Sequence, residues 1–277
     1  MALNPYLPHL ATLLEVREET EDIKTFRLAF DDPEVSSAWQ YLPGQIALLS
    51  LFGVGEAAFS LSSAPLGQGW LEFSIRRMGK VTTALHQLEP GAKVGIRGPF
   101  GRGFPCELFR GHDLLVIGGG IGMAPLRSLV NYVLARREDY GRLEIVYGAR
   151  SSRQFCFREE IFFLWPQAPD TQVYLTIDCP EEGWEGHVGF VPDYVAELKP
   201  SPEGKYAVVC GPPIMIEKTI AWLEKQGFPP ERIYTTLEMR MKCGIGKCGR
   251  CNLGAKFVCL SGPVFSWAEL KEEKERF

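Results

Sequence analysis

Four cysteines near the end of the chain have the spacing of metal ligands. They follow a C-x4-C-x2-C-x7-C pattern and are Cys243, Cys248, Cys251 and Cys259. The first three positions match loops that wrap a [2Fe–2S] cluster, and the intervening glycines let the backbone turn tightly around the inorganic sulfides. Because zinc sites usually have two C-x2-4-C pairs set farther apart, the spacing favours a [2Fe–2S] cluster over a four-cysteine zinc site or a disulfide pair.

A glycine-rich turn, Gly118–Pro125, follows the apolar run Asp113–Gly118 and precedes a helical pattern. Glycines let a phosphate approach the backbone, and the start of a helix offers free N–H groups with a positive dipole end. The turn does not match G-x-G-x-x-G, so it is not a dehydrogenase fingerprint. Nucleotide binding is favoured by the strand–turn–helix context, with tight packing as the alternative.

Distinctive residues also follow three other predicted strands. These segments are Tyr147–Arg150, Thr176–Asp178 and Cys210–Met215. Ligands of open α/β sheets bind outside the carboxyl ends of the strands, so four such segments together predict a nucleotide site more strongly than the glycine turn alone.

Two segments in the first third of the chain carry hydroxyl groups, Phe59–Ser63 and Gly79–Thr83. The second places two threonines at the start of a predicted helix. This arrangement is typical of a helix N-cap and also suits a pyrophosphate, and taken alone the N-cap is favoured.

The elements around these residues change character along the chain. Residues 1–108 read as six short strands with one helical stretch, Val81–Leu88, which suggests a small antiparallel barrel. Residues 109–233 alternate buried strands with helices, as in a doubly wound nucleotide-binding domain. Residues 234–277 contain the cysteine loop and are predicted to form a small third domain.

Composition limits the functional class. The chain has 277 residues, a formal charge of −4 and no basic footprint for nucleic acid. We see neither a signal peptide nor an apolar run long enough to span a membrane, so we expect a cytoplasmic protein whose remaining four cysteines are reduced thiols.

Together these motifs resemble the ferredoxin–NADP reductase superfamily, in its branch with a C-terminal [2Fe–2S] loop. Most similar are the gamma (diaphorase) subunits of cytosolic NAD(P)-linked nickel–iron hydrogenases and sulfhydrogenases. The corresponding component of anaerobic sulfite reductase, the electron-transfer subunit of dihydroorotate dehydrogenase and flavin subunits that feed heterodisulfide reductase are also similar. The resemblance implies an FAD-binding barrel, an NAD(P)-binding domain and an iron–sulfur domain.

The resemblance assigns roles to individual residues. Ser60 would lie near the reactive nitrogen of the flavin, and Cys210 would lie beside the nicotinamide; these are the expected catalytic residues. The family's R-x-Y-S motif falls on Ala57–Ser60, where Ala57 replaces the arginine expected on the FAD pyrophosphate. This departure weakens the assignment of FAD rather than FMN as the flavin, although Arg76, Lys80 and the helix start could hold a pyrophosphate.

The cofactor-binding residues expected for FAD and NAD(P)H form two sets. The flavin set is Phe59, Ser60, Leu61, Ser62, Ser74, Ile75, Arg76, Gly79, Lys80, Val81, Thr82 and Thr83. The nucleotide set is Gly119, Gly120, Ile121, Gly122, Met123, Ala124, Pro125, Gly148, Arg150, Asp178, Cys210, Gly211, Pro212 and Met215. Arg150 and Arg153 could meet the 2′-phosphate of NADPH, or could be ordinary surface charges.

The implied function is electron transfer from NAD(P)H through the flavin and the cluster to a redox partner subunit such as a hydrogenase. We expect the cluster to lie at a protein–protein interface, with basic residues around it that steer the partner. These are Arg240, Lys242, Lys247 and Arg250. The alternatives are a subunit of a sulfite reductase or heterodisulfide reductase complex, a self-sufficient NAD(P)H diaphorase or ferredoxin reductase, and a zinc-bearing nucleotide sensor.

Overall fold

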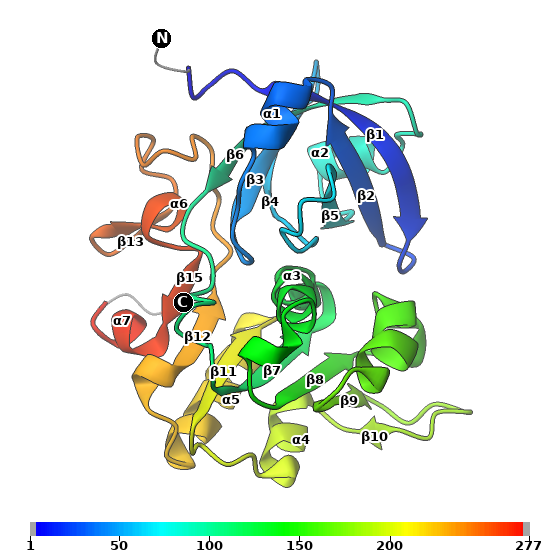
Figure 1. Ribbon diagram of the computed structural model, residues 1–277. Helices are drawn as coiled ribbons and strands as arrows, with labels where there is room; N and C mark the ends of the chain where they lie inside the picture. The colour runs from blue at the N-terminus through cyan, green and yellow to red at the C-terminus, as the bar shows by residue number, and fades with distance from the viewer. Residues whose placement is uncertain (1–3, 274–277) are drawn as a thin grey trace.

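The computed structural model describes residues 4–273, which begin with a curled antiparallel sheet (Figure 1). Its strand order is β4-β3-β6-β1-β2-β5, and the edge strands β4 and β5 contact one another. Alternating apolar residues face the barrel core, which confirms the predicted architecture. The strands are β1 (His9–Glu18), β2 (Ile23–Phe30), β3 (Ile46–Leu51), β4 (Gly55–Ser60), β5 (Leu71–Arg76) and β6 (Lys93–Phe100).

The barrel contains two short helices, where the sequence predicted one. The additional helix is α1 (Pro33–Ala38), and α2 (Lys80–Leu85) is shorter than the predicted Val81–Leu88. The Asp32 side chain accepts a hydrogen bond from the Glu34 N–H, and Pro33 occupies the first turn of α1. An Asp-Pro start of this kind is a helix signal, but the helix is too short to show an apolar period.

The next part is a mostly parallel sheet with helices on both faces (Figure 1). The strand order is β10-β9-β8-β7-β11-β12-β15, which confirms the doubly wound domain. Its strands are β7 (Asp113–Gly119), β8 (Leu143–Ala149), β9 (Thr171–Ile177), β10 (His187–Val188), β11 (Lys205–Cys210) and β12 (Ile233–Thr236). Its helices are α3 (Met123–Leu134), a π-helical turn (Glu160–Leu164), α4 (Val191–Leu198) and α5 (Pro213–Lys225).

The C-terminal segment is built into this sheet. Strand β15 (Val264–Ser266) pairs antiparallel with β12, with Thr236 opposite Val264. The other elements are β13 (Asn252–Leu253), β14 (Lys256–Phe257), α6 (Val258–Ser261) and α7 (Trp267–Lys271). The domain limits 1–108, 109–233 and 234–277 stay a prediction, and their outer ends, residues 1–3 and 274–277, lie outside the described residues.

Within residues 4–273, no helix combines the length and the apolar character needed to cross a membrane.

Candidate functional site

The predicted flavin residues lie on the two edge strands of the barrel. Phe59 and Ser60 end β4 and are half-buried, whereas Ser74, Ile75 and Arg76 end β5. The β4 and β5 edges touch without joining the same ladder, so their outer backbone groups are not used by each other. The seam between them therefore offers backbone donors and acceptors beside an aromatic ring, which fits a flat ligand with polar edges such as a flavin.

Three of the predicted residues support this seam from inside the barrel. Leu61 is fully buried. The Ser74 hydroxyl lies 2.8 Å from the Thr25 hydroxyl and donates to the Ser62 hydroxyl over 3.1 Å. The side chains of Ser62 and Ser74 are thus satisfied within the protein. The backbone of Ser62 is used as well, because its N–H donates to the Glu72 carbonyl over 2.9 Å and its carbonyl accepts from Arg127 over 3.2 Å.

The start of α2 shows the capping arrangement. The Thr82 hydroxyl accepts hydrogen bonds from the backbone N–H groups of Met78 and Gly79, at 2.9 and 2.8 Å. Thr83 and Lys80 are exposed, and Val81 packs against the barrel core. A side chain added at Gly79 would meet nothing within 4 Å. Capping therefore occupies Thr82, while Lys80 and Thr83 lie exposed near the open space at Gly79.

The glycine-rich turn serves both packing and access. At Gly122 an added Cβ would lie 2.6 Å from the Cys210 carbonyl oxygen, and at Gly119 it would overlap the sulfur of Met215. These two glycines are required by packing inside the protein. Gly120 differs: its φ is +53°, and its carbonyl accepts a hydrogen bond from the Tyr147 hydroxyl. A Cβ added there would lie 3.6 Å from the guanidinium of Arg76 in the barrel. The barrel seam and the nucleotide turn therefore meet at Gly120.

The rest of this turn forms the start of α3. Ile121 is half-buried against the core, and Met123, Ala124 and Pro125 are buried. Their positions fix the direction in which α3 leaves the turn.

The predicted nucleotide residues converge at one end of the parallel sheet. Gly118 pairs with both Tyr147 and Cys210, and Gly148 pairs with Thr176, so the four strands end level with one another. This register brings the four distinctive segments to a single edge, as strand polarity predicts.

Two of these segments also contribute to packing. A side chain at Gly148 would overlap Val191 of α4. Met215 fills the space beside Gly211, and Pro212 precedes α5.

Asp178 and the exposed Arg150 interact: burial raises the pKa of Asp178, and the charge of Arg150 opposes that rise.

Cys210 is a neutral thiol at the end of β11. Its side chain is buried, and burial raises its pKa to about 12 even though a hydrogen bond with Thr236 acts in the opposite direction. The sulfur lies 3.3 Å from the Thr236 hydroxyl on β12. A thiol held in this way can position a ring by contact but is not a nucleophile at neutral pH.

The four sulfurs of the cysteine loop interact with one another. Cys243 interacts with Cys248, and Cys259 interacts with both Cys251 and Cys243. Among residues 4–273, no three His, Cys, Asp or Glu side chains converge as ligands of a single ion. The four cysteines that the spacing predicts as ligands thus belong to one loop and interact there.

Backbone N–H groups in this loop point at the sulfurs, as the glycine spacing predicts. Lys247 and Cys248 donate to Cys243 Sγ at 3.3 and 3.4 Å, and Gly246 donates to Cys259 Sγ at 3.3 Å. Positive φ angles of +76° at Gly244 and +70° at Gly246 turn the chain for this purpose. Such hydrogen bonds stabilise thiolates, so the loop suits an anionic iron–sulfur centre.

Sequence reasoning did not find the polar residues that join the domains. Arg127 of α3 donates to Glu72 of β5 and to Glu160, each over 2.6 Å, and both Arg127 and Glu72 are buried. Burial raises the pKa of Glu72, but the charge of Arg127 leads the interactions that lower it below its usual range. An isolated charged residue in an apolar pattern is the only local signal for such a pair.

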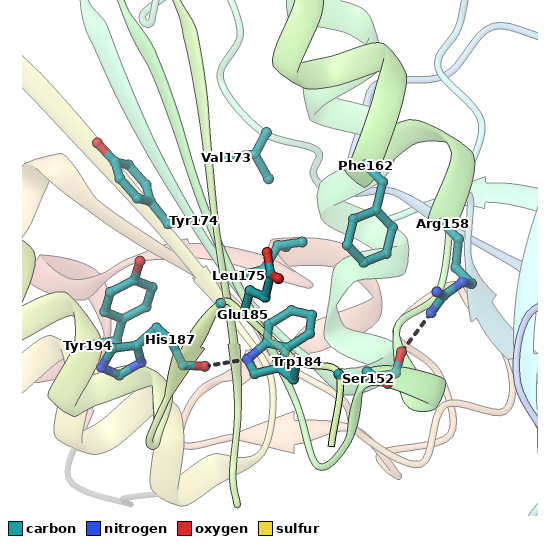
Figure 2. Close-up of a pocket in the computed structure, with 12 residues that line it drawn as sticks. Ser152, Arg158, Phe162, Val173, Tyr174, Leu175, Trp184, Glu185, His187 and Tyr194 are labelled. Carbon is teal, nitrogen blue, oxygen red and sulfur yellow. Dashed lines mark hydrogen bonds between the residues drawn. The ribbon is translucent and has the colours of Figure 1, made fainter. Parts of the chain in front are cut away.

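A separate cavity of about 580 Å³ lies beside β9 and the segment before α4 (Figure 2). Trp184 donates to the His187 carbonyl and Arg158 donates to the Ser152 carbonyl, so these polar groups are used within the protein. His187 stacks on Tyr194. None of the residues predicted to bind a cofactor lines this cavity.

Three domain families match successive parts of the chain. The oxidoreductase FAD-binding domain matches residues 10–104, and the oxidoreductase NAD-binding domain matches residues 116–220. The iron–sulfur cluster binding domain of dihydroorotate dehydrogenase B matches residues 238–271. These matches confirm FAD, a nicotinamide nucleotide and an iron–sulfur centre as the cofactors, and the prediction of iron–sulfur over zinc is confirmed with them.

Similar proteins cover nearly the whole chain. Sulfhydrogenase 1 subunit gamma of Pyrococcus furiosus is 39% identical over 96% of this chain and 93% of its own length. The probable dihydroorotate dehydrogenase B (NAD(+)) electron transfer subunit of the same organism is 34% identical over 92% of this chain and 89% of its own.

Solved structures agree with the fold. The cytochrome P450 reductase of Amycolatopsis is 26% identical with a TM-score of 0.71, over 82% of this chain and 68% of its own. An NADH-dependent reduced ferredoxin-NADP oxidoreductase, 23% identical, has a TM-score of 0.75 over 99% of this chain and 94% of its own. On these matches, the chain belongs to the iron–sulfur flavoprotein electron-transfer subunits of the ferredoxin–NADP reductase superfamily.

Proposed function

We propose that the chain passes electrons between NAD(P)H and a partner redox subunit, such as a hydrogenase, in a larger cytoplasmic complex. The observation that carries this proposal is the likeness to a sulfhydrogenase gamma subunit over 96% of this chain. The likeness to dihydroorotate dehydrogenase electron-transfer subunits supports the same role with a different partner. Eight free cysteines, four of them in a cluster loop, suit the reducing cytoplasm.

The cofactors supply the redox chemistry: bound FAD exchanges a hydride with NAD(P)H and exchanges electrons singly with the iron–sulfur centre. The residues of the chain position these groups. Phe59 and Ser60 would line the flavin seam, and Gly120 would face the nucleotide pyrophosphate beside Arg76. Cys210, held by Thr236, would set the position of the nicotinamide ring without a covalent bond.

We propose that the centre is a single [2Fe–2S] cluster held by the four loop cysteines. The C-x4-C-x2-C-x7-C spacing and the N–H groups directed at the sulfurs support this type. Metal analysis of anaerobically purified protein should give two irons per chain, as that cluster requires. Stoichiometric zinc without iron would contradict the proposal.

We propose that Lys80 and Thr83 hold the pyrophosphate of the FAD, because Ala57 stands where an arginine is expected. Support comes from the exposure of Lys80 and Thr83 and from the open space at Gly79, where an added Cβ would meet nothing within 4 Å. Acid release of the flavin followed by chromatography tests the assignment. Release of FMN would show that the change at position 57 had altered the cofactor.

The exposed edge of the cluster loop supports the partner proposal. Cys248 is exposed, and so are the basic residues at positions 240, 242, 247 and 250. A cluster at the surface can come close to the next acceptor, and a basic rim can steer an acidic partner.

The functional experiment compares the isolated chain with the native complex. The isolated chain should reduce artificial dyes with NAD(P)H but form no hydrogen, sulfide or dihydroorotate. Purification from its native cells should recover a second redox subunit. Full-rate reduction of a physiological small-molecule acceptor by the lone chain would favour the diaphorase alternative.

A further inference from the structure

Arg97 is a buried arginine on β6 of the barrel that the flavin and nucleotide sites do not use. Its side chain is only 6% exposed. Its Nε–Nη2 edge faces Glu56 of β4, donating over 2.9 and 2.5 Å to the two carboxylate oxygens. Burial raises the pKa of Glu56, but hydrogen bonds from Arg97 and Ser50 outweigh burial and lower it. The pair is therefore ionised inside the protein.

The Arg97 guanidinium also donates hydrogen bonds to the cysteine loop. Nη1 donates to the carbonyl of Cys243 over 3.3 Å, and Nη2 donates to the carbonyl of Lys242 over 3.4 Å. Nη1 also donates to the carbonyl of Pro5 over 2.8 Å. Cys243 is the first cysteine of the proposed cluster, so a buried cation contacts the backbone of a cluster ligand.

The same strand packs directly against the loop. Phe100 of β6 lies beneath Gly244, where an added Cβ would come within 2.7 Å of the ring. The guanidinium of Arg97 lies 5.7 Å from the centre of this ring. The loop thus packs on β6 through the Phe100 ring and the Arg97 guanidinium. Because the Arg97 side chain is only 6% exposed, solvent screens its charge weakly.

The sign of the effect follows from the chemistry of the centre. Reduction adds a negative charge to an iron–sulfur cluster, and nearby charge and hydrogen bonding are among the features that set its potential. A cation beside Cys243 stabilises the reduced form, whereas the carboxylate of Glu56 opposes it from farther away. Lys242 also interacts with Glu56, but it is exposed and better screened.

We propose that Arg97 and Glu56 form a positioning pair that tunes the reduction potential of the cluster through the backbone of Cys243. This inference rests on the proposed cluster site. It links the barrel that binds flavin to the centre that receives its electrons.

The test is a redox titration of the cluster, followed by electron paramagnetic resonance, in the full chain with its cofactors. Arg97→Gln should lower the midpoint potential, because it removes the nearby cation. Glu56→Gln should raise it, because Arg97 then lacks its counter-charge. The double variant should lie between the two, and Arg97→Lys should stay closer to wild type than Arg97→Gln.

Arg102→Gln is the matched control. Arg102 also joins the barrel to the C-terminal segment, but it binds Glu269 and the carbonyl of Val264, and its side chain is 45% exposed. Its loss removes the same charge and should leave the potential near the wild-type value.

A purely structural clamp would move both single variants in the same direction, or leave both potentials unchanged, and either result overturns the inference. If Arg97→Gln does not retain iron, the sign measured for Glu56→Gln decides: a raised potential supports the inference, and an unchanged or lowered one overturns it. A wild-type chain that contains no iron would instead overturn the proposed cluster site itself, and this inference with it.

Discussion

Two cysteines in different parts of the molecule show how one side chain serves two purposes. Cys210 ends a central strand, where burial raises its pKa to about 12. Cys243 begins the cluster loop, where burial also raises the pKa, but N–H groups of Ile245, Cys248 and Lys247 outweigh it and lower the pKa to about 6. In a strand the N–H groups are used by the sheet, whereas the loop turns them toward sulfur. The N–H groups directed at the sulfur therefore account for the difference between Cys243 and Cys210. Cys259 of the same loop accepts one such hydrogen bond, from Gly246, and there burial and the neighbouring thiols still raise the pKa to about 12.

The largest expected effect is loss of a cluster ligand. Cys251→Ala should lower bound iron by about tenfold or more, since the remaining thiolates cannot complete two iron sites. Iron analysis and visible absorption of anaerobic protein measure this. Cys106→Ala, at another buried thiol, should keep full iron. Normal iron content in Cys251→Ala would show that this cysteine is not a ligand.

Substitution at Cys210 should affect a rate and leave the cofactors in place. Cys210→Ala should slow flavin reduction by NAD(P)H about 10- to 100-fold, because the nicotinamide loses a positioning contact. Stopped-flow absorption measures the rate, and the spectra of flavin and cluster should match those of wild type. The comparison between the two cysteines would fail if reduction proceeded at the wild-type rate.

The protonation state of Cys210 predicts how the folding stability and the reactivity of this thiol depend on pH. Its pKa rises from the usual 9.0 to about 12 in the folded chain. The stability that it contributes is therefore complete below about pH 9 and is lost as the pH rises toward 12. At pH 8, iodoacetamide should label Cys210 far more slowly than the exposed Cys179, as measured by peptide mass spectrometry. Equal labelling would mean that Cys210 is accessible and ionised.

The smallest effect is expected at the partner of Cys210. Thr236→Val removes the hydroxyl beside the sulfur and should cost about 1 kcal/mol in the free energy of unfolding. Flavin reduction should slow by a few-fold at most. Thr235→Val is a matched control, since the buried Thr235 hydroxyl has no hydrogen-bond partner, and its loss should be neutral or stabilising. Chemical denaturation compares the two, and a larger loss in Thr235→Val would contradict the assignment.

Much of the candidate site could be predicted because its signals are local. The cysteine spacing, the glycines that turn the loop and the strand-end segments all lie within short stretches. Contacts between distant segments have no comparable local signal in the sequence. Thr236 meets Cys210 only because β12 lies beside β11, and Arg127 meets Glu72 only because α3 packs on the barrel. Arg97 lies in a strand with no distinctive local pattern, and only the fold brings it to the Cys243 carbonyl.

Residue type and spacing along the chain determined the order of barrel, nucleotide domain and cluster loop, because periodicity and ligand spacing act over a few residues. Only the tertiary structure decided that β15 completes the nucleotide sheet and that Gly119 and Gly122 are needed by Met215 and Cys210. It also decided which buried charges are paired across the domains. The physical reason is that burial of a polar group is favourable only with a partner, and that partner is chosen in space rather than in sequence.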